Sequence, residues 1–353
     1  MDLNQYASFH QLDPQDMLGN IDGLPDQLSK AWRLGQSLPL PDWKGIERVV
    51  ITGMGGSAIG ADLLNAYMES QCSVPVCVYR DYVLPAWVRG PQTLVIASSH
   101  SGNTEETLAA FEEATRRGCL RLAISTGGKL SAAAQSSGAT LWLFEHRGQP
   151  RAAVGFSFGL LLAVFTRLGF IADPSTELEE AISAMQTQQA SLKASVPVTQ
   201  NPAKRQAGQL MGRWVVVLGS GILSPVARRW KGQISEVAKA WAQFEFLPEA
   251  DHNTLAGSKN PEDKLVQTTV LFLSSPSDHP RNALRTELTR STLMLDGFGT
   301  DTYHAQGKSP LAHLWTALHF GDYMAFYLAM LYDADPTPVA ALEKLKKDLS
   351  SRS

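Results

Sequence analysis

Cysteine is scarce in this chain of 353 residues, which contains only Cys72, Cys77 and Cys119. Three cysteines cannot all pair and no CxxC motif occurs, so a disulfide framework and a structural zinc site are both disfavoured. This cysteine usage fits a reducing compartment, and we expect the protein to be cytoplasmic. The N-terminus lacks the basic and apolar regions of a signal peptide, so no such peptide is predicted.

Charge of one sign is not in excess, and no apolar run is long. The 31 basic and 34 acidic residues leave a net charge of −3, so neither a nucleic acid nor an anionic membrane is an expected partner. The longest apolar run, residues 152–166, contains Ser157 and is too short to span a bilayer. The apolar content of 44% disfavours a disordered chain.

Two segments show the pattern of a buried strand, a glycine turn and a helix. In the first, residues 49–52 lead through glycines 53, 55 and 56 into a helix over 58–69. In the second, residues 214–218 lead through Gly219-Ser220-Gly221 into a helix from about 225 to 242. Further strands are expected at 74–79, 93–98, 120–125, 140–144, 243–246, 268–273 and 293–295, and further helices at 104–117, 262–265 and 311–331. This alternation predicts an α/β fold with parallel sheets, and the recurrence indicates two similar domains that arose by duplication.

The chain length, and the polar stretch that separates the two halves, predict two domains. Residues 1–45 are expected to form helices ahead of the first strand, and the polar stretch 173–195 is expected to form a linking helix. We place the boundary near residue 175, with a first domain over 1–175 and a second over 176–353.

The first glycine loop, Gly53-Met54-Gly55-Gly56-Ser57, follows a strand and opens a helix. Glycines allow a ligand to approach the backbone, and the free amides of a first helical turn favour an anion. The match to the dinucleotide pattern G-x-G-x-x-G fails at Ala58, and Arg80-Asp81 stand where an acidic ribose ligand is expected. The loop alone is therefore compatible with a phosphate site or with a simple tight turn.

A second loop, residues 98–107, gives a clearer signal. Ser99, Ser101 and Thr104 place three hydroxyls around one glycine beside another helix start, a set that can bind a phosphate dianion without lysine. A capping box of Asn103 and Glu106 is the structural alternative, but it explains only part of the cluster. A Walker loop is excluded because leucine follows Gly127-Gly128-Lys129.

The two loops together resemble the sugar isomerase (SIS) domain, which holds the phosphate of a phosphosugar. The whole chain is similar to the bifunctional phosphoglucose/phosphomannose isomerases, through the segments GDYMAFYLA (321–329) and DPTP (335–338). The resemblance implies two tandem SIS domains, each a flavodoxin-like parallel sheet sandwiched by helices. It also implies that no cofactor or metal is needed, and that five residues of the loops bind the substrate phosphate: Gly56, Ser57, Ser99, Ser101 and Thr104.

Interconversion of glucose 6-phosphate, and of mannose 6-phosphate as well, with fructose 6-phosphate needs a ring-opening acid/base, a carboxylate base and an enediolate-stabilising cation. The resemblance assigns the carboxylate to Glu236 and the cation to Arg151. It assigns ring opening to His252, which would lie in the partner subunit's site and so implies a homodimer. Lys308 would assist ring opening or bind hydroxyls. His100 is the second choice among the histidines, whereas His313 and His319 are expected to be interior or interface residues.

Several other functions fit parts of this sequence. One is a non-catalytic phosphosugar sensor, although residues 1–45 lack a convincing helix-turn-helix, and another is an isomerase of a different phosphosugar. A glucosamine 6-phosphate synthase would need a glutaminase with a cysteine nucleophile, but position 2 is Asp. A dehydrogenase is the remaining alternative.

Overall fold

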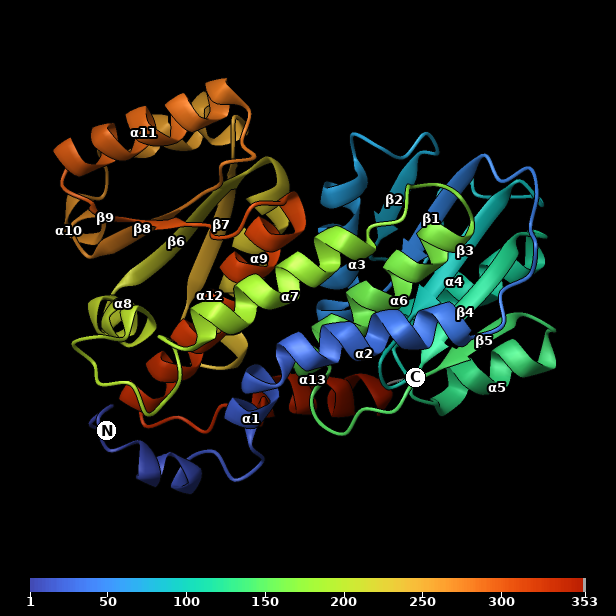
Figure 1. Ribbon diagram of the computed structural model, residues 1–353, viewed down its shortest axis with the longest axis horizontal. Helices are drawn as coiled ribbons and strands as arrows, with labels where there is room; N and C mark the ends of the chain where they lie inside the picture. The colour runs from blue at the N-terminus through green and yellow to red at the C-terminus, as the bar shows by residue number, and fades with distance from the viewer. Residues whose placement is uncertain (352–353) are drawn as a thin grey trace.

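The computed structural model describes residues 1–351, and its first half is built on a parallel sheet of five strands within that range (Figure 1). The strand order is β2-β1-β3-β4-β5, which is the flavodoxin-like order. The strands are β1 (Arg48–Thr52), β2 (Val76–Tyr79), β3 (Thr93–Ser98), β4 (Leu120–Ser125) and β5 (Thr140–Leu143). Each pair is parallel, as the alternation of strands and helices predicted.

A second parallel sheet, of four strands within the described residues, follows with the order β7-β6-β8-β9. Its strands are β6 (Trp214–Ser220), β7 (Ala242–Leu247), β8 (Thr268–Ser274) and β9 (Gly299–His304). In chain order this arrangement repeats the first four strands of the first sheet, so the predicted α/β class and the duplication are confirmed.

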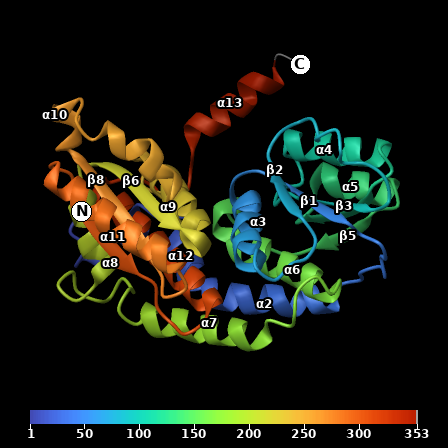
Figure 2. The same cartoon turned by 90° about the horizontal axis from the view of Figure 1, so that it is seen from above.

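Helices surround both sheets (Figures 1 and 2). Those before the second sheet are α1 (Met17–Asp22), α2 (Leu24–Ser37), α3 (Gly55–Met68), α4 (Glu105–Arg116), α5 (Gly128–Ser136), α6 (Val154–Arg167), α7 (Ser175–Gln189) and α8 (Pro202–Leu210). Those after its first strand are α9 (Ser224–Glu236), α10 (Glu262–Leu265), α11 (Pro280–Leu295), α12 (Pro310–Leu331) and α13 (Ala340–Ser350). Short 3-10 turns are η1 (Tyr6–Gln11), η2 (Pro150–Ala153), η3 (Gly221–Leu223), η4 (Glu249–His252) and η5 (Thr254–Gly257).

The two halves share one hydrophobic core. A single cluster of buried side chains includes residues of α3 and α6 from the first half and of α9 and α12 from the second. Helices α6 and α12 are buried almost throughout, which is why their sequences are apolar on all sides rather than striped. Because α3 packs directly against α9, the loops at their ends are held in a fixed relation.

Two sequence-based expectations are wrong. Residues 293–295 were expected to form a strand, but they end α11, and the strand is β9 over the polar segment Gly299–His304. The helix expected to reach residue 242 ends at Glu236, because Lys239 adopts a left-handed backbone conformation and Ala242 already begins β7. Helix α7 starts at Ser175, but the domain division at that residue stays a prediction.

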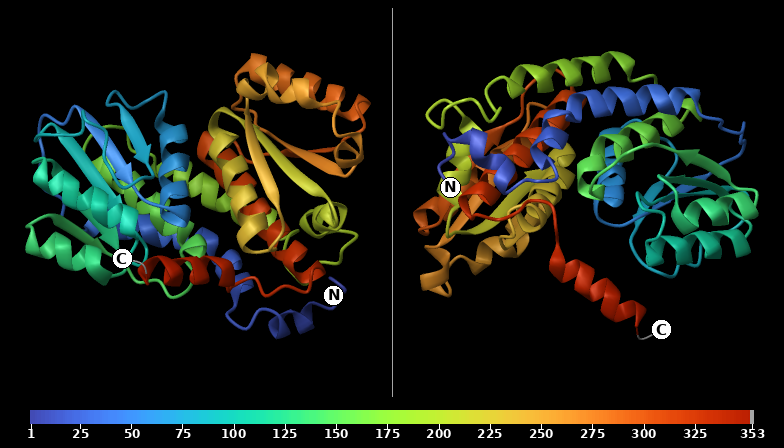
Figure 3. Two further views of the ribbon diagram at one scale, coloured as in Figure 1. Left: turned by 180° about the vertical axis from the view of Figure 1, so that it is seen from behind. Right: turned by 90° about the horizontal axis from the view of Figure 1, so that it is seen from below.

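Helix α13 stands apart from both sheets (Figures 2 and 3). All of its residues are exposed, including Leu342, Leu345 and Leu349, whose spacing puts them along one side of the helix. None of the helices within residues 1–351 has the length and apolar character needed to cross a membrane.

Candidate active site

The loop after β3 brings together the hydroxyls expected to bind phosphate. Ser99 Oγ lies 3.0 Å from Thr104 Oγ1 and accepts the backbone N–H of Gly102 at 3.1 Å. Gly102 has a φ of +66°, and a Cβ there would lie 1.9 Å from the carbonyl oxygen of Gly127. Only glycine fits this position, so the loop is locked against the start of α5.

Residues of the first glycine loop join the same cluster. Ser57 lies in the first turn of α3 and is buried, and its Oγ accepts the backbone N–H of His100 at 3.2 Å. Ser101 is exposed, and its Oγ accepts the backbone N–H of Asn103 at 3.2 Å. The two loops, 45 residues apart in the sequence, are therefore joined by a hydrogen bond in one cluster of hydroxyl side chains.

Helix capping does not account for the cluster. The N-cap residue of α4 is Thr104, not Asn103, and within residues 1–351 its side chain makes no capping hydrogen bond. Asn103 instead accepts the backbone N–H of Lys129 at 3.1 Å. The amides at the start of α4 therefore remain suited to an anion.

His100 is held away from proton exchange at neutral pH. Its Nε2 lies 3.0 Å from His146 Nδ1, and its ring packs edge-on against Phe144. Burial, with a smaller contribution from His146, lowers the pKa of His100 to about 4. The ring therefore stays neutral at pH 7, which disfavours His100 as the ring-opening acid.

Arg151 and Glu236 meet where the two halves of the chain come together. Arg151 in η2 is 4% exposed, and its Nη1 lies 3.5 Å from Oε2 of Glu236, the last residue of α9. Arg151 Nη2 donates to the carbonyl oxygens of Pro336, at 3.0 Å, and Thr337. Burial lowers the pKa of Arg151 from its ordinary value, and the charge of Glu236 opposes that shift.

A buried ion pair that the sequence did not reveal holds the main chain of Arg151 in place. Arg229 Nε and Nη2 donate to the two carboxylate oxygens of Asp322 at 3.0 and 2.8 Å. Arg229 Nη2 also donates to the carbonyl oxygen of Arg151 at 2.8 Å. The signal in the sequence was a lone carboxylate, Asp322, inside the apolar stretch 311–331.

A cavity of about 360 Å³ lies between the start of α3 and the end of α9, and Arg151 and Glu236 line it together with Gly55 and Gly56. Its other charged lining residues are all cationic: Arg80, Arg228, Arg229 and Lys231. Asp62 pairs with both Arg80 and Arg228, and Asp322 pairs with Arg229. The cations still outnumber the carboxylates around the cavity, and this excess positive charge favours an anionic ligand.

Gly56 allows a close backbone contact beside this cavity. A Cβ at Gly56 would lie 2.5 Å from the carbonyl oxygen of Pro150, so only glycine lets α3 approach η2 this closely. The same residue therefore belongs to the predicted phosphate loop and sets the position of Arg151 beside it.

Comparison with known proteins agrees with this geometry. Residues 199–349 match the model of the bacterial phospho-glucose isomerase C-terminal SIS domain. The chain is 40% identical over 336 residues to a bifunctional phosphoglucose/phosphomannose isomerase of Caldicellulosiruptor bescii, covering 95% of this chain and 99% of that protein. The chain belongs to the bifunctional phosphoglucose/phosphomannose isomerase family.

Two further similarities extend the comparison. The family member from Aquifex aeolicus is 35% identical over 317 residues, covering 89% of this chain and 93% of that protein. The crystal structure of tagatose-6-phosphate ketose/aldose isomerase from Escherichia coli shares the fold, with a TM-score of 0.72 at 18% identity, and covers 92% of this chain and 95% of that one. Each half of this family member therefore has the SIS fold.

His252 and Lys308 do not join Glu236 within one chain. Glu236 ends α9 at the edge where the strands of the second sheet begin, whereas His252 and Lys308 follow β7 and β9 at the edge where they end. A strand of six residues spans about 20 Å, so the sheet separates them. Both side chains are exposed, and the backbone N–H of Lys308 donates to Glu180 Oε1 at 2.9 Å.

His313 and His319 are interior residues, as expected. His313 Nδ1 lies 2.7 Å from Ser277 Oγ, and His319 Nε2 lies 2.8 Å from the carbonyl oxygen of Ile21. Burial lowers the pKa of His319 to about 4, so this ring is neutral at pH 7.

The second half carries a counterpart of the phosphate loop, but its own carboxylate occupies it. After β8, Asp278 Oδ2 accepts the backbone N–H of Ser275 at 2.8 Å. Asp278 Oδ1 accepts the hydroxyl of Ser220, which belongs to the second glycine turn, at 2.8 Å. This negative charge disfavours a phosphate, so the first half is the better suited to hold it.

Proposed function

We propose that this chain interconverts glucose 6-phosphate, and mannose 6-phosphate as well, with fructose 6-phosphate by proton transfer through a cis-enediol. The observation that carries the proposal is the Arg151–Glu236 pair in a cavity that also includes Gly55 and Gly56 of the phosphate loop. A base, a cation and an anion-binding helix start are thus within reach of one small sugar phosphate.

Glu236 is the proposed base. In the open-chain aldose, its carboxylate takes the proton from C2, and the electron pair left behind forms the C1–C2 double bond of the enediolate as the C1 carbonyl oxygen gains negative charge. The hydroxyl proton on the C2 oxygen then passes to the C1 oxygen. Return of the carbon-bound proton from Glu236 to C1 gives the ketose, so the carboxylate ends the cycle ionised. Glu236 keeps partial access to the cavity, with 34% of its side chain exposed, as a group that must touch substrate requires.

Arg151 is the proposed stabiliser of the enediolate. Its guanidinium is fixed by the carbonyl oxygens of Pro336 and Thr337, so it does not need to reorganise when the negative charge develops. Among residues 1–351, nothing accepts a hydrogen bond from Arg151 Nε, which is buried. Nη1, which lies 3.5 Å from Glu236 Oε2, is the guanidinium donor beside the proposed base.

The phosphate would be bound by the backbone at Gly56 and by the hydroxyls of Ser57, Ser99, Ser101 and Thr104. In support, these groups surround the starts of α3 and α4, where backbone amides attract an anion. Binding the phosphate in the first half would place the sugar carbons toward Glu236 of the second half.

One assay tests the activity directly. We expect purified protein, given fructose 6-phosphate in the presence of EDTA, to form both glucose 6-phosphate and mannose 6-phosphate. Formation of neither sugar would refute the proposal, and glucose 6-phosphate alone would refute the part concerning mannose.

The proposed enzyme is a homodimer in which each subunit presents His252 and Lys308 to its partner's site. Support comes from the position of both residues on one exposed edge of the second sheet, away from their own Glu236. Exposed apolar side chains add further support: Leu284, Leu288 and Leu295 on α11, and the three leucines of α13.

Mixing two inactive variants tests the shared site. Chains carrying Glu236→Gln and chains carrying His252→Ala are each expected to be nearly inactive, and equal mixtures should regain about a quarter of wild-type activity, because half of the dimers contain one complete site. Subunit exchange is checked with tagged chains of different mass. Confirmed exchange without recovered activity would contradict the shared site.

The cellular setting is part of the same proposal. Cys72, Cys77 and Cys119 are free thiols, as suits the cytoplasm, where these sugar phosphates connect glycolysis and gluconeogenesis. We also retain the division into domains at residue 175, since α7 begins there and packs against one helix of each half, α2 and α12.

A further inference from the structure

Lys239 has a backbone conformation that is unusual for a lysine. It lies three residues beyond Glu236 with a φ of +56°, in the left-handed region that glycine usually fills at the end of a helix. The amide of the next residue, Ala240, donates to the carbonyl oxygen of Ile234 at 3.2 Å, which closes the end of α9. Glycine would close it with less strain, so a lysine here calls for an explanation in its side chain.

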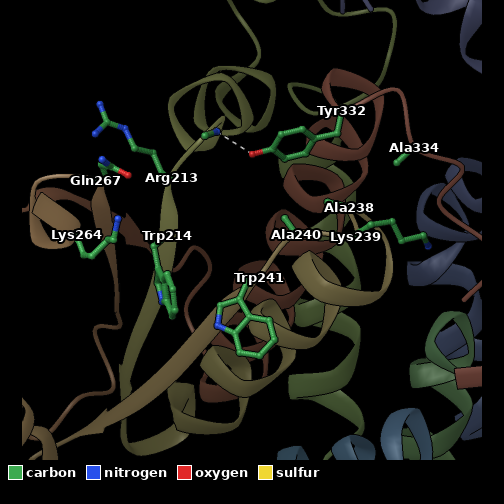
Figure 4. Close-up of a pocket in the computed structure, with 11 residues that line it drawn as sticks. Arg213, Trp214, Ala238, Lys239, Ala240, Trp241, Lys264, Gln267, Tyr332 and Ala334 are labelled. Carbon is green, nitrogen blue, oxygen red and sulfur yellow. Dashed lines mark hydrogen bonds between the residues drawn. The ribbon is translucent and has the colours of Figure 1, made fainter. Parts of the chain in front are cut away.

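The exposed side chain of Lys239 folds back onto the end of α9. In Figure 4 it extends away from Trp214, Trp241 and the other residues that line the neighbouring pocket. Its Nζ donates to the carbonyl oxygen of Glu236 at 2.5 Å, and so holds the main chain of the proposed base.

The charges of groups from three segments act on this ammonium. They are Arg151 of η2, Glu236 of α9 and Asp335 of the segment after α12. Loss of hydration, followed by the charge of Arg151, lowers the pKa of Lys239 to about 8, and the two carboxylates oppose the shift. Lysine at this position therefore changes charge in a pH range where an enzyme works.

We propose that Lys239 is a positioning residue of the isomerase site: its ammonium fixes the main chain of Glu236, the proposed base, and adds a positive charge at the end of α9 that bears this base. This inference rests on the proposed function. It predicts that turnover depends on the protonated amine and that substrate affinity, which comes mainly from the phosphate loops, does not.

Three substitutions separate this role from helix capping. Lys239→Gly keeps the left-handed conformation without strain, so its midpoint of thermal unfolding should equal or exceed that of the wild type. Lys239→Met removes the charge and keeps the length of the chain, and Lys239→Arg keeps a charge that does not titrate. Lys44→Met, at an exposed loop lysine paired with Asp42, is the matched control.

We expect Lys239→Gly and Lys239→Met to lower kcat at pH 7 by about tenfold with KM changed less than about threefold. In the wild type, kcat should fall as pH rises through about 8, because the amine loses its charge. Lys239→Arg should keep most of the activity and lose that alkaline decline. A Lys239→Met variant with wild-type kcat, or with the same decline near pH 8, would overturn the proposal.

A second measurement does not depend on activity. The rate at which Lys239 reacts with acetic anhydride, followed by mass spectrometry of the peptide, should rise with a midpoint near pH 8. A midpoint above about 10, the ordinary range for lysine, would overturn the proposed charge change. If the wild type isomerises neither sugar, the proposed function fails and the role of Lys239 fails with it; if the wild type is active, the variants decide the role of Lys239 alone.

Discussion

Replacing Glu236 with glutamine is expected to lower kcat by about 1,000-fold or more, with KM changed only a few-fold. Glutamine has nearly the shape of glutamate but cannot take a proton, so the substrate still binds and the C2 proton stays in place. The substitution also removes the charge 3.5 Å from Arg151 Nη1, while the anchors of Arg151 at Pro336 and Thr337 remain. The measurements are kcat and KM for fructose 6-phosphate and exchange of the substrate's C–H hydrogen with solvent.

Two further variants make the result interpretable. Glu236→Asp retains a carboxylate on a shorter side chain and should keep more activity than Glu236→Gln. Glu112→Gln removes an exposed carboxylate on α4, outside the cavity, and should behave as the wild type. Full turnover by Glu236→Gln would show that another group is the base, even in an active isomerase.

Most of the fold could be predicted because the strands are buried and short. The strand β3 is buried at every position and is followed by a helix start, so its short apolar sequence indicates a buried strand of an α/β unit. The strand β9 was missed because it is polar and only partly buried, whereas the apolar segment 293–295 simply continues α11. A strand at the edge of a sheet is only partly buried, so its sequence need not show the apolar pattern by which buried strands are recognised.

The hydroxyl cluster could also be predicted, because Ser99, Ser101 and Thr104 are close in the sequence and share a loop. The ion pair that holds Arg151 could not be predicted, because Arg229 and Asp322 lie 93 residues apart in the sequence. Nothing local marks Arg229 as buried in a helix that carries several polar residues. The conformation of Lys239 could not be predicted for another reason: a lysine in the sequence gives no sign that its backbone is left-handed.

The buried pair of Arg229 and Asp322 gives the largest expected effect on stability. Both side chains are at most 4% exposed, and they share two hydrogen bonds of 3.0 and 2.8 Å. Asp322→Ala leaves the guanidinium buried without its counter-charge, and should lower the free energy of unfolding by about 3–5 kcal/mol. Urea unfolding followed by tryptophan fluorescence measures the change.

A double variant distinguishes the loss of the pair from the loss of one partner. Replacing both residues, as Arg229→Met with Asp322→Leu, removes the uncompensated charge and should recover most of the stability lost in Asp322→Ala. It should not recover turnover, because Arg229 also donates to the carbonyl oxygen of Arg151 at 2.8 Å and no apolar side chain can replace that bond. An unfolding free energy for Asp322→Ala within about 1 kcal/mol of wild type would contradict the first expectation. Wild-type kcat in a stable double variant would contradict the second, and would mean that Pro336 and Thr337 alone hold Arg151 in place.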